Sequence, residues 1–271
     1  MKFLGFRRPD GKVGIRNHVL VLATVGCAAE AARQTADGIY GAVSFINQNG
    51  CGESSRNLRR TQDVLVGMAA NPNVYGVVAI GLSCEMNRMD GFIKELRART
   101  DKPIEGLLIQ EEGGTIETVA KAKKIARRMV IEASMCRREE CDISELMLGI
   151  ECGGSDATSG LVSNPVMGII SDRIIAAGCQ LIVFTTGRGN AIGSAVAPVM
   201  KVTANGDTAR KLSDNIDLDM SAVLEEGVSL DAMAHITMQQ ILDTLSGRLT
   251  SAEALKLGYS EAVISRACEY C

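Results

Sequence analysis

The sequence lacks the features that mark a membrane-spanning or exported chain. No apolar run among its 271 residues is long enough to cross a bilayer, and the N-terminus lacks the apolar core of a signal peptide. Acidic and basic residues nearly balance, at a net charge of -3, which disfavours nonspecific binding to nucleic acid or to an anionic membrane. We therefore expect a cytoplasmic globular protein, and a hydrophobic content of 46% is sufficient for a large buried core.

Several enzyme signatures are also absent. No GxxxxGK[ST] loop occurs, and Gly153, Gly154 and Gly160 do not form a GxGxxG fingerprint, so a nucleotide-dependent enzyme is disfavoured. The two histidines, His18 and His235, are not accompanied by a GxSxG motif, which disfavours a Ser-His-Asp hydrolase. The nine cysteines are an odd number in a chain too long to need disulfides, so we expect reduced thiols.

Apolar runs and helical patterns alternate along most of the chain. Runs typical of strands occupy residues 18–25, 42–46, 74–81, 104–109, 146–150 and 179–185, and helical patterns occupy residues 28–39, 58–70, 86–99, 115–133 and 166–177. Continuous apolar strands are buried on both faces, so the pattern predicts an α/β fold with a mostly parallel, Rossmann-like sheet flanked by helices. The C-terminal stretch shows helical patterns and no convincing strand, which predicts a helical appendage. We expect an α/β core over residues 1–186 and a glycine-loop and helical segment over residues 187–271 that packs on it.

Ligands of such sheets bind at the carboxyl ends of the strands, and here those ends are rich in thiols and polar groups. Four of the six strand ends carry a cysteine, namely Cys27, Cys51, Cys84 and Cys152. A single thiol in this position is usually a small buried group, but four at one edge of one sheet indicate a shared site. We therefore expect one sheet over residues 17–186 with these loops clustered at one edge.

The segment Glu151-Cys-Gly-Gly-Ser-Asp156 is the most informative of these strand ends. Its two carboxylates and one thiol suit a divalent metal or a hydroxy acid, and its two glycines allow a ligand to approach the backbone closely. The alternative is a strand-to-helix turn in which Ser155 or Asp156 caps the helix. Further along the chain, Gly187, Arg188 and Gly189 can present backbone N–H groups and one guanidinium to a carboxylate or phosphate.

Ordered motifs along almost the entire chain resemble the altronate/galactarate dehydratase family, which also includes the large subunit of (2R)-sulfolactate sulfo-lyase. These motifs occupy residues 6–17, 25–27, 71–74, 81–85, 112–115, 151–156, 184–189 and 197–201. The resemblance implies elimination of water, or of sulfite in the sulfo-lyase, from a 2-hydroxy or sugar acid. It also implies a divalent metal, iron(II) in the first place.

The resemblance and the chemistry of such an elimination assign roles to the strand-end residues. The reaction needs a base for the α-proton, a group that holds the enediolate charge, and an acid for the leaving hydroxyl. The expected catalytic residues are Glu85, Glu151, Asp156 and Lys201; the expected substrate-binding residues are Asn17, Gly153, Gly154, Ser155, Thr186, Gly187, Arg188 and Gly189; and the expected metal ligands are Cys51, Cys84 and Cys152. Mixed oxygen and thiolate ligation suits iron better than magnesium. No residue is identified as the base.

Two departures from the family pattern bear on activity. Asn47 stands where family members usually have a His, in the loop before Gly-Cys-Gly. The chain also runs directly from residues 171–178 into residues 179–184, whereas the family carries a further stretch of subdomain size between them. We therefore expect a shortened relative that folds cooperatively but, by itself, turns over sugar acids poorly or not at all.

Three functions remain open on the sequence: a metal-dependent hydro-lyase, a sulfo-lyase subunit that needs a small partner protein, and a noncatalytic acid-binding module. Each would bind a small carboxylic acid. The sequence is also compatible with a separate N-terminal domain and with a homo-oligomer.

Overall fold

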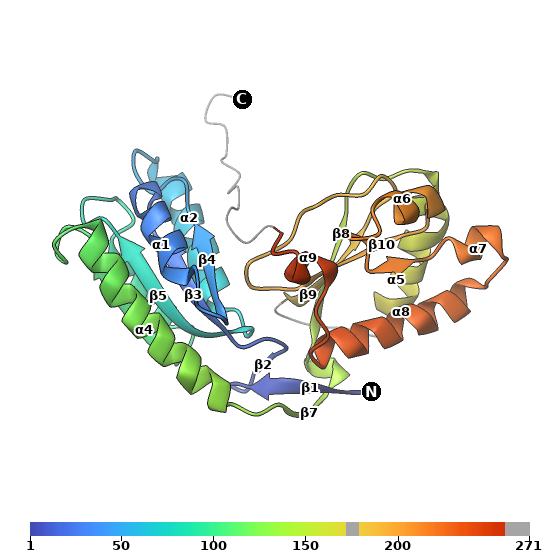
Figure 1. Ribbon diagram of the computed structural model, residues 1–271, viewed down its shortest axis with the longest axis horizontal. Helices are drawn as coiled ribbons and strands as arrows, with labels where there is room; N and C mark the ends of the chain where they lie inside the picture. Colours follow the sequence, from blue (N-terminus) through green and yellow to red (C-terminus); the bar gives the residue numbers. More distant parts are fainter. Residues whose placement is uncertain (172–178, 258–271) are drawn as a thin grey trace. The chain divides into compact units, whose positions relative to one another are not determined.

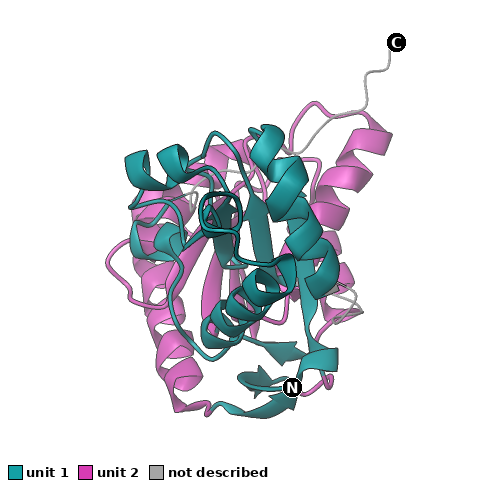
Figure 2. Ribbon diagram, turned by 90° about the vertical axis from the view of Figure 1, so that its right-hand side faces the viewer, with its two compact units in different colours: residues 1–8, 12–16, 138–258 teal, residues 9–11, 17–137, 259–271 magenta. Residues whose placement is uncertain are grey.

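The computed structural model describes residues 1–171 and 179–257 and divides the chain into two compact units (Figures 1 and 2). Unit 1 contains residues 1–8, 12–16 and the chain from residue 138 onward as far as it is described, and unit 2 contains residues 9–11 and 17–137. Unit 2 is therefore built mainly from one continuous stretch that interrupts unit 1. The expected boundary at residue 186 differs from this division, since it falls between neighbouring strands of one sheet in unit 1.

Unit 2 contains a four-stranded parallel sheet with helices on both faces. Its strands are β3 (His18–Ala23), β4 (Ala42–Ile46), β5 (Val74–Gly81) and β6 (Ile104–Leu108), in the order β4-β3-β5-β6. A short 3-10 turn, η1 (Gly26–Ala28), leads into α1 (Ala29–Ala36), and α2 (Ser55–Ala70), α3 (Met89–Arg97) and α4 (Thr115–Met135) follow. Helices α1 and α4 pack together over one face, where Val19, Val21 and Val78 form a core with them, and α2 packs with α3 on the other.

Unit 1 contains a second four-stranded parallel sheet and a small antiparallel sheet. The parallel strands are β8 (Met147–Cys152), β9 (Cys179–Thr185), β10 (Val199–Thr203) and β11 (Leu218–Asp219), in the order β11-β10-β9-β8. The antiparallel sheet has the order β2-β1-β7, from β1 (Lys2–Arg7), β2 (Val13–Gly14) and β7 (Glu139–Asp142). The helical elements are η2 (Ile143–Glu145), η3 (Ser159–Ser163), α5 (Asn164–Ser171), α6 (Gly206–Lys211), α7 (Ala222–Glu225), α8 (Leu230–Leu245) and α9 (Ser251–Ala254).

The predicted α/β class, the parallel pairing, the flanking helices and the helical C-terminal region are confirmed. The prediction of one sheet over residues 17–186 was wrong, because β8 and β9 pair with each other and with β10 rather than with the strands of unit 2. The view that the C-terminal stretch holds no strand was also wrong. Strand β10 was missed because Lys201 interrupts its apolar pattern, although all five of its residues are buried. Within the described residues, no helix is long and apolar enough to span a bilayer.

A buried ion pair ties the N-terminal strands of unit 1 to its C-terminal helices. The Arg16 Nε donates to Glu253 Oε1 at 2.7 Å, and its other nitrogens donate to the carbonyls of Ile15, Thr244 and Arg248. The side chains of Arg16 and Glu253 are only 6% and 8% exposed. Glu253 also accepts from Thr250 N at 2.9 Å, which completes a capping box at the start of α9. One carboxylate thus serves both the ion pair and the helix cap.

We expect Glu253→Ala to destabilise the protein by about 3–5 kcal/mol, because it leaves the Arg16 charge buried without its partner. Urea unfolding followed by circular dichroism measures the effect. The matched control is Glu30→Ala, which removes an exposed ion pair with Arg33 and should leave the unfolding midpoint nearly unchanged. Equal midpoints for the two variants would contradict a stabilising role for the buried pair.

Candidate functional site

The carboxyl ends of the parallel strands form one group of loops in each unit. The expected site residues are accordingly divided: Glu85, Cys51 and Cys84 follow strands of unit 2, whereas those from Glu151 to Lys201 lie in unit 1. The prediction that all of them share the edge of one sheet was wrong, because β8, β9 and β10 belong to one sheet and β3, β4 and β5 belong to another. Each group is described by itself.

In unit 1, the two glycine loops are hydrogen-bonded to each other. The Gly154 carbonyl accepts from the N–H groups of Gly187 at 3.1 Å and Arg188 at 2.8 Å. The Gly189 N–H donates to Thr186 Oγ1 at 2.9 Å. These N–H groups are therefore used inside the loops, and a bound acid would meet side chains there. The exposed Arg188 guanidinium forms no ion pair within residues 1–171 and 179–257.

Asp156 caps the helical turn that follows it. Its Oδ1 accepts from Thr158 N at 2.9 Å and from Ser159 N at 3.2 Å, and its Oδ2 accepts from Asn205 Nδ2 at 2.9 Å. Burial acts to raise the pKa of Asp156, but the hydrogen bonds from Thr158, Asn205 and Ser159 together outweigh it and lower the pKa. Of the two capping residues proposed from the sequence, Asp156 makes these bonds, and both of its oxygens are engaged.

Cys152 presents an exposed thiol at the end of β8, next to the exposed Glu151 carboxylate. Its Sγ lies 2.8 Å from Ser155 Oγ. Hydrogen bonds from Ser155 and Thr185 lower the pKa of Cys152 against the opposing effect of burial. A thiol with these neighbours is more reactive than an isolated one, because a larger fraction is thiolate.

Lys201 lies on the same row of the sheet as Glu151. The register places Glu151 beside Phe184 and Phe184 beside Lys201. Lys201 is fully buried, and its Nζ has no hydrogen-bond partner among the described residues. Burial lowers the pKa of Lys201, while the charge of Asp217 acts in the opposite direction. An amine with a lowered pKa releases its proton more readily than an exposed lysine, which suits acid–base chemistry.

In unit 2, Glu85 anchors the loop after β5. Its buried carboxylate accepts from Ser83 N at 2.6 Å, Leu82 N at 3.2 Å and Thr24 Oγ1 at 3.2 Å. A Cβ at Gly81 would overlap with Glu85 Oε1, so only glycine fits beneath this carboxylate. Thr24 was not among the expected site residues, although a hydroxyl at the end of an apolar strand was a usable signal.

Two asparagines of unit 2 make structural contacts. Asn47, at the position where the resemblance implies a His, is buried, and its Nδ2 donates to the Thr24 carbonyl at 2.9 Å, which ties two loops together. Asn17 precedes β3 and therefore lies at the amino end of this strand, at the opposite edge from the strand-end loops. Its Nδ2 donates to the Ala133 carbonyl at 2.7 Å.

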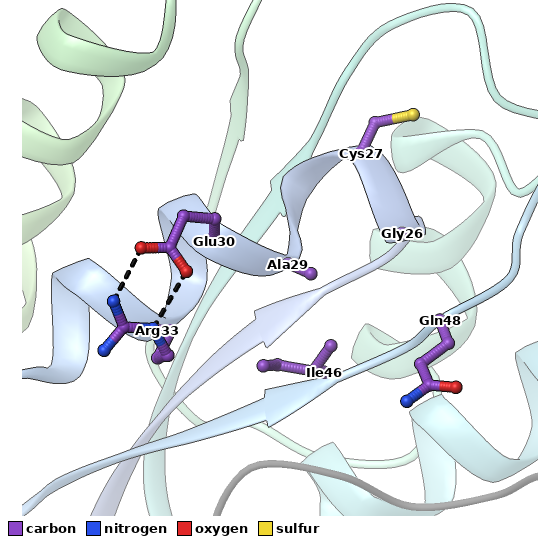
Figure 3. Close-up of a pocket in the computed structure, with 7 residues that line it drawn as sticks. All are labelled: Gly26, Cys27, Ala29, Glu30, Arg33, Ile46 and Gln48. Atoms are coloured by element: carbon purple, nitrogen blue, oxygen red, sulfur yellow. Dashed lines mark hydrogen bonds and ion pairs between the residues drawn. The ribbon is translucent and has the colours of Figure 1, made fainter.

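A hollow of about 580 Å³ opens where β3 and β4 end (Figure 3). It is lined by Gly26, Cys27, Ala29, Glu30, Arg33, Ile46 and Gln48. Its two charged side chains pair with each other, since Arg33 donates to both oxygens of Glu30 at 2.8 and 2.6 Å. None of the expected catalytic residues lines this hollow.

The described residues do not fit the expected site for a single metal ion. No group of three or more His, Cys, Asp or Glu side chains within residues 1–171 and 179–257 is arranged to hold one. Of the expected thiolate ligands, Cys51 and Cys84 belong to unit 2 and Cys152 belongs to unit 1.

Two family models match the chain, and each of them covers most of one unit. A model described as "D-galactarate dehydratase/Altronate hydrolase, second domain" matches residues 5–134. A model described as "D-galactarate/Altronate dehydratase, C-terminal" matches residues 143–178 and 173–269. The two segments of the second match meet at the expected internal join, which lies outside the described residues.

Three relatives illustrate the extent of the similarity. The chain is 28% identical over 386 residues to the (2R)-sulfolactate sulfo-lyase subunit beta of Chromohalobacter salexigens, with 98% of each chain covered. It is 33% identical to the altronate dehydratases of Escherichia coli and Bacillus subtilis, over 64% and 65% of this chain but only 36% and 37% of theirs. The chain thus spans about a third of these dehydratases. The first alignment is longer than the 271 residues of this chain, so the sulfo-lyase subunit carries a segment that this chain lacks.

Gly187→Ala should destabilise unit 1 by about 1–3 kcal/mol, because the new Cβ would overlap with the Asp156 carboxylate that caps the next turn. The control is Gly160→Ala, where no atom lies within 4 Å of the added Cβ, so the helical turn should be unchanged or slightly more stable. Urea midpoints followed by circular dichroism compare the two. Normal stability of Gly187→Ala would show that Asp156 can move without cost.

Ser155→Ala should slow alkylation of Cys152 near neutral pH. Loss of the Ser155 hydrogen bond raises the thiol pKa back toward its ordinary value, so the thiolate fraction falls and the pH–rate midpoint moves upward. Peptide mass spectrometry after timed iodoacetamide treatment measures the rate, with Cys136 of the same molecule as the internal control. An unchanged midpoint would mean that Ser155 does not stabilise the thiolate.

Proposed function

Since the chain belongs to the galactarate/altronate dehydratase family, we propose that it is a lyase that eliminates water from a sugar acid or a related 2-hydroxy acid. The observation that carries this proposal is the arrangement at the strand ends of unit 1. There, the exposed Glu151 carboxylate and the exposed Arg188 guanidinium belong to two adjoining segments that are hydrogen-bonded through Gly154. A carboxylate suited to proton exchange and a guanidinium suited to anion binding thus lie on neighbouring segments at the strand ends of one sheet.

The chemistry assigns these side chains complementary roles. The planar Arg188 guanidinium would bind the substrate carboxylate in a bidentate manner, which also stabilises the charge that develops when the α-proton leaves. Glu151 would exchange a proton with the substrate, as acceptor of the α-proton or as donor to the leaving hydroxyl. Ser155 and Cys152 would provide polar contacts beside them.

The buried groups would act through these exposed ones. Lys201 does not reach the surface, so we assign it a positioning role on the sheet row of Glu151, where Asp217 is the charged group that acts on its amine. Asp156 would fix the loop geometry through its cap, and Glu85 would do the same in unit 2.

The resemblance of the sequence motifs to the family implies a divalent metal, iron(II) in the first place, and we include it in the proposal. When bound, a metal would polarise the leaving hydroxyl as a Lewis acid. Because no three-residue group among the described residues fits a single ion, the roles assigned above depend on side chains alone.

A second candidate is the large subunit of a sulfo-lyase. It is favoured by one observation, namely that the similarity to a sulfolactate sulfo-lyase subunit beta extends over 98% of both chains. That relative is named as a subunit, so this candidate would require a partner subunit. The two candidates differ in the group that leaves, hydroxide or sulfite, and the same carboxylate-binding rim would serve both.

A substrate screen tests the proposal. We expect the anaerobically purified chain, supplied with iron(II), to form a 2-keto acid from altronate, galactarate or a related acid at a low rate, and to release no sulfite from sulfolactate. Glu151→Gln should lower kcat/KM by about 10²–10⁴-fold, as expected for an acid–base group. The control is Glu226→Gln, which changes an exposed carboxylate elsewhere in unit 1.

The other outcomes separate the alternatives. Sulfite release, especially after addition of a small partner subunit, would support the sulfo-lyase. Acid binding by calorimetry without turnover of any substrate would indicate a noncatalytic module. Full activity of Glu151→Gln would overturn the assigned role, and rapid turnover by the chain alone would show that the segment found in the relatives is dispensable.

A further inference from the structure

Three exposed cysteines follow three neighbouring strands of unit 2. Cys27, Cys51 and Cys84 come after β3, β4 and β5, and all three are exposed free thiols. Free cysteines are among the most frequently buried residues, so three exposed ones at one edge are unusual. The strands run parallel in the order β4-β3-β5, about 4.8 Å apart, which brings the three strand ends together.

Hydrogen bonds beside the cysteines hold the three loops together. The Gly26 N–H, next to Cys27, donates to the Asn49 carbonyl at 2.8 Å. The Gly50 carbonyl, next to Cys51, accepts from Met86 N at 3.2 Å, two residues beyond Cys84. The contact leaves no room for a side chain, because a Cβ at Gly50 would lie 2.7 Å from the Thr24 carbonyl. The backbones that carry the three thiols are therefore fixed close to one another.

Three further observations indicate that a ligand binds at this edge. The strand order reverses between β3 and β5, and ligands of such sheets bind outside the strand ends at this reversal. The Asn87 Oδ1 atom at the same edge is buried and has no hydrogen-bond partner among the described residues, although its amide nitrogen donates to the Thr24 carbonyl. Ser83, directly before Cys84, has φ of 119°, a strained conformation that is common at functional sites.

We propose that Cys27, Cys51 and Cys84 ligate an iron–sulfur cluster of the four-iron type, in which one iron has no protein ligand. Cysteine thiolates are the usual protein ligands of iron–sulfur clusters. A single thiolate-bound ion needs donors that converge to within about 2.3 Å of one point, and the described residues provide no such group. In a cluster, each thiolate binds a different iron, so thiols spread over three loops are suitable.

The proposal accounts for the number of thiols as well as their spread. Three thiolates would leave one iron with an open position, and such an iron would supply Lewis-acid chemistry toward a hydroxyl group. Each thiol would lose its proton on ligation, and equal amounts of iron(II) and iron(III), with inorganic sulfide, would be supplied from outside the chain, so that assembly needs no further oxidant. The inference depends on unit 2 alone, so it can fail while the lyase proposal stands.

Anaerobic reconstitution of the full chain with equal amounts of iron(II) and iron(III) and with sulfide tests the proposal. We expect about four irons and four acid-labile sulfides per chain, with the broad visible absorption of a cluster that bleaches on reduction. Cys27→Ser, Cys51→Ser and Cys84→Ser should each lose most of the iron and the sulfide. The matched controls are Cys136→Ser, an exposed cysteine of the same unit, and Cys152→Ser in unit 1, and both should retain the cluster.

A second measurement on the unmodified chain does not depend on how the variants fold. Reconstitution should protect Cys27, Cys51 and Cys84 from alkylation and leave Cys136 reactive, as read by peptide mass spectrometry. Iron bound without labile sulfide, or zinc bound in its place, would overturn the proposal. Equal loss of iron in Cys136→Ser or Cys152→Ser, or unprotected thiols at the three strand ends, would also overturn it.

Discussion

Parallel strands that are buried on both faces leave no place for polar side chains along their length, and this constraint determines where chemistry can occur. In unit 2, residues 19–23 of β3 are entirely inaccessible to solvent. Polar groups therefore gather at the strand ends, where many satisfy one another. Both oxygens of Glu85 accept from its own loop, and those of Asp156 accept from its own loop and from Asn205. Among the described residues, the groups left for a ligand include Arg188 in unit 1 and the thiols of Cys27, Cys51 and Cys84 in unit 2.

Buried and half-buried arginines hold the segments of unit 1 together, in addition to apolar packing. Three arginines, Arg8, Arg16 and Arg138, each lie next to a point where the chain passes between the units. Their guanidinium groups donate to main-chain carbonyls of the N-terminal segment, those of Leu4, Ile15 and Arg16. Arg138 also stacks on Phe6, with 4.5 Å between the guanidinium carbon and the ring centre. Burial, assisted by the charge of Arg16, lowers the pKa of Arg138 to about 10. A nearby carboxylate, Glu253, offsets part of this positive charge.

Much of the fold was predictable because apolar runs mark buried strands wherever they pair. Strands β4 and β5 begin and end at the predicted residues. Pairing was not predictable, since an apolar run does not specify its neighbour, and a charged residue such as Lys201 conceals a buried strand. Similarly, residue type does not show whether a carboxylate is free. Glu85 and Asp156 were both expected to be catalytic, with a helix cap as the alternative for Asp156, and in the structure the carboxylate of each holds a loop.

The division of the chain has a consequence for the order in which it can fold. Strand β1 pairs with β7, whose residues are synthesised more than a hundred positions later, whereas residues 17–137 form a continuous body with its own core. Unit 2 can therefore complete its sheet on the ribosome while β1 has only the short strand β2 beside it. The edge of β1 that later pairs with β7 must then stay open through the synthesis of another domain, which exposes it to chaperones and to aggregation.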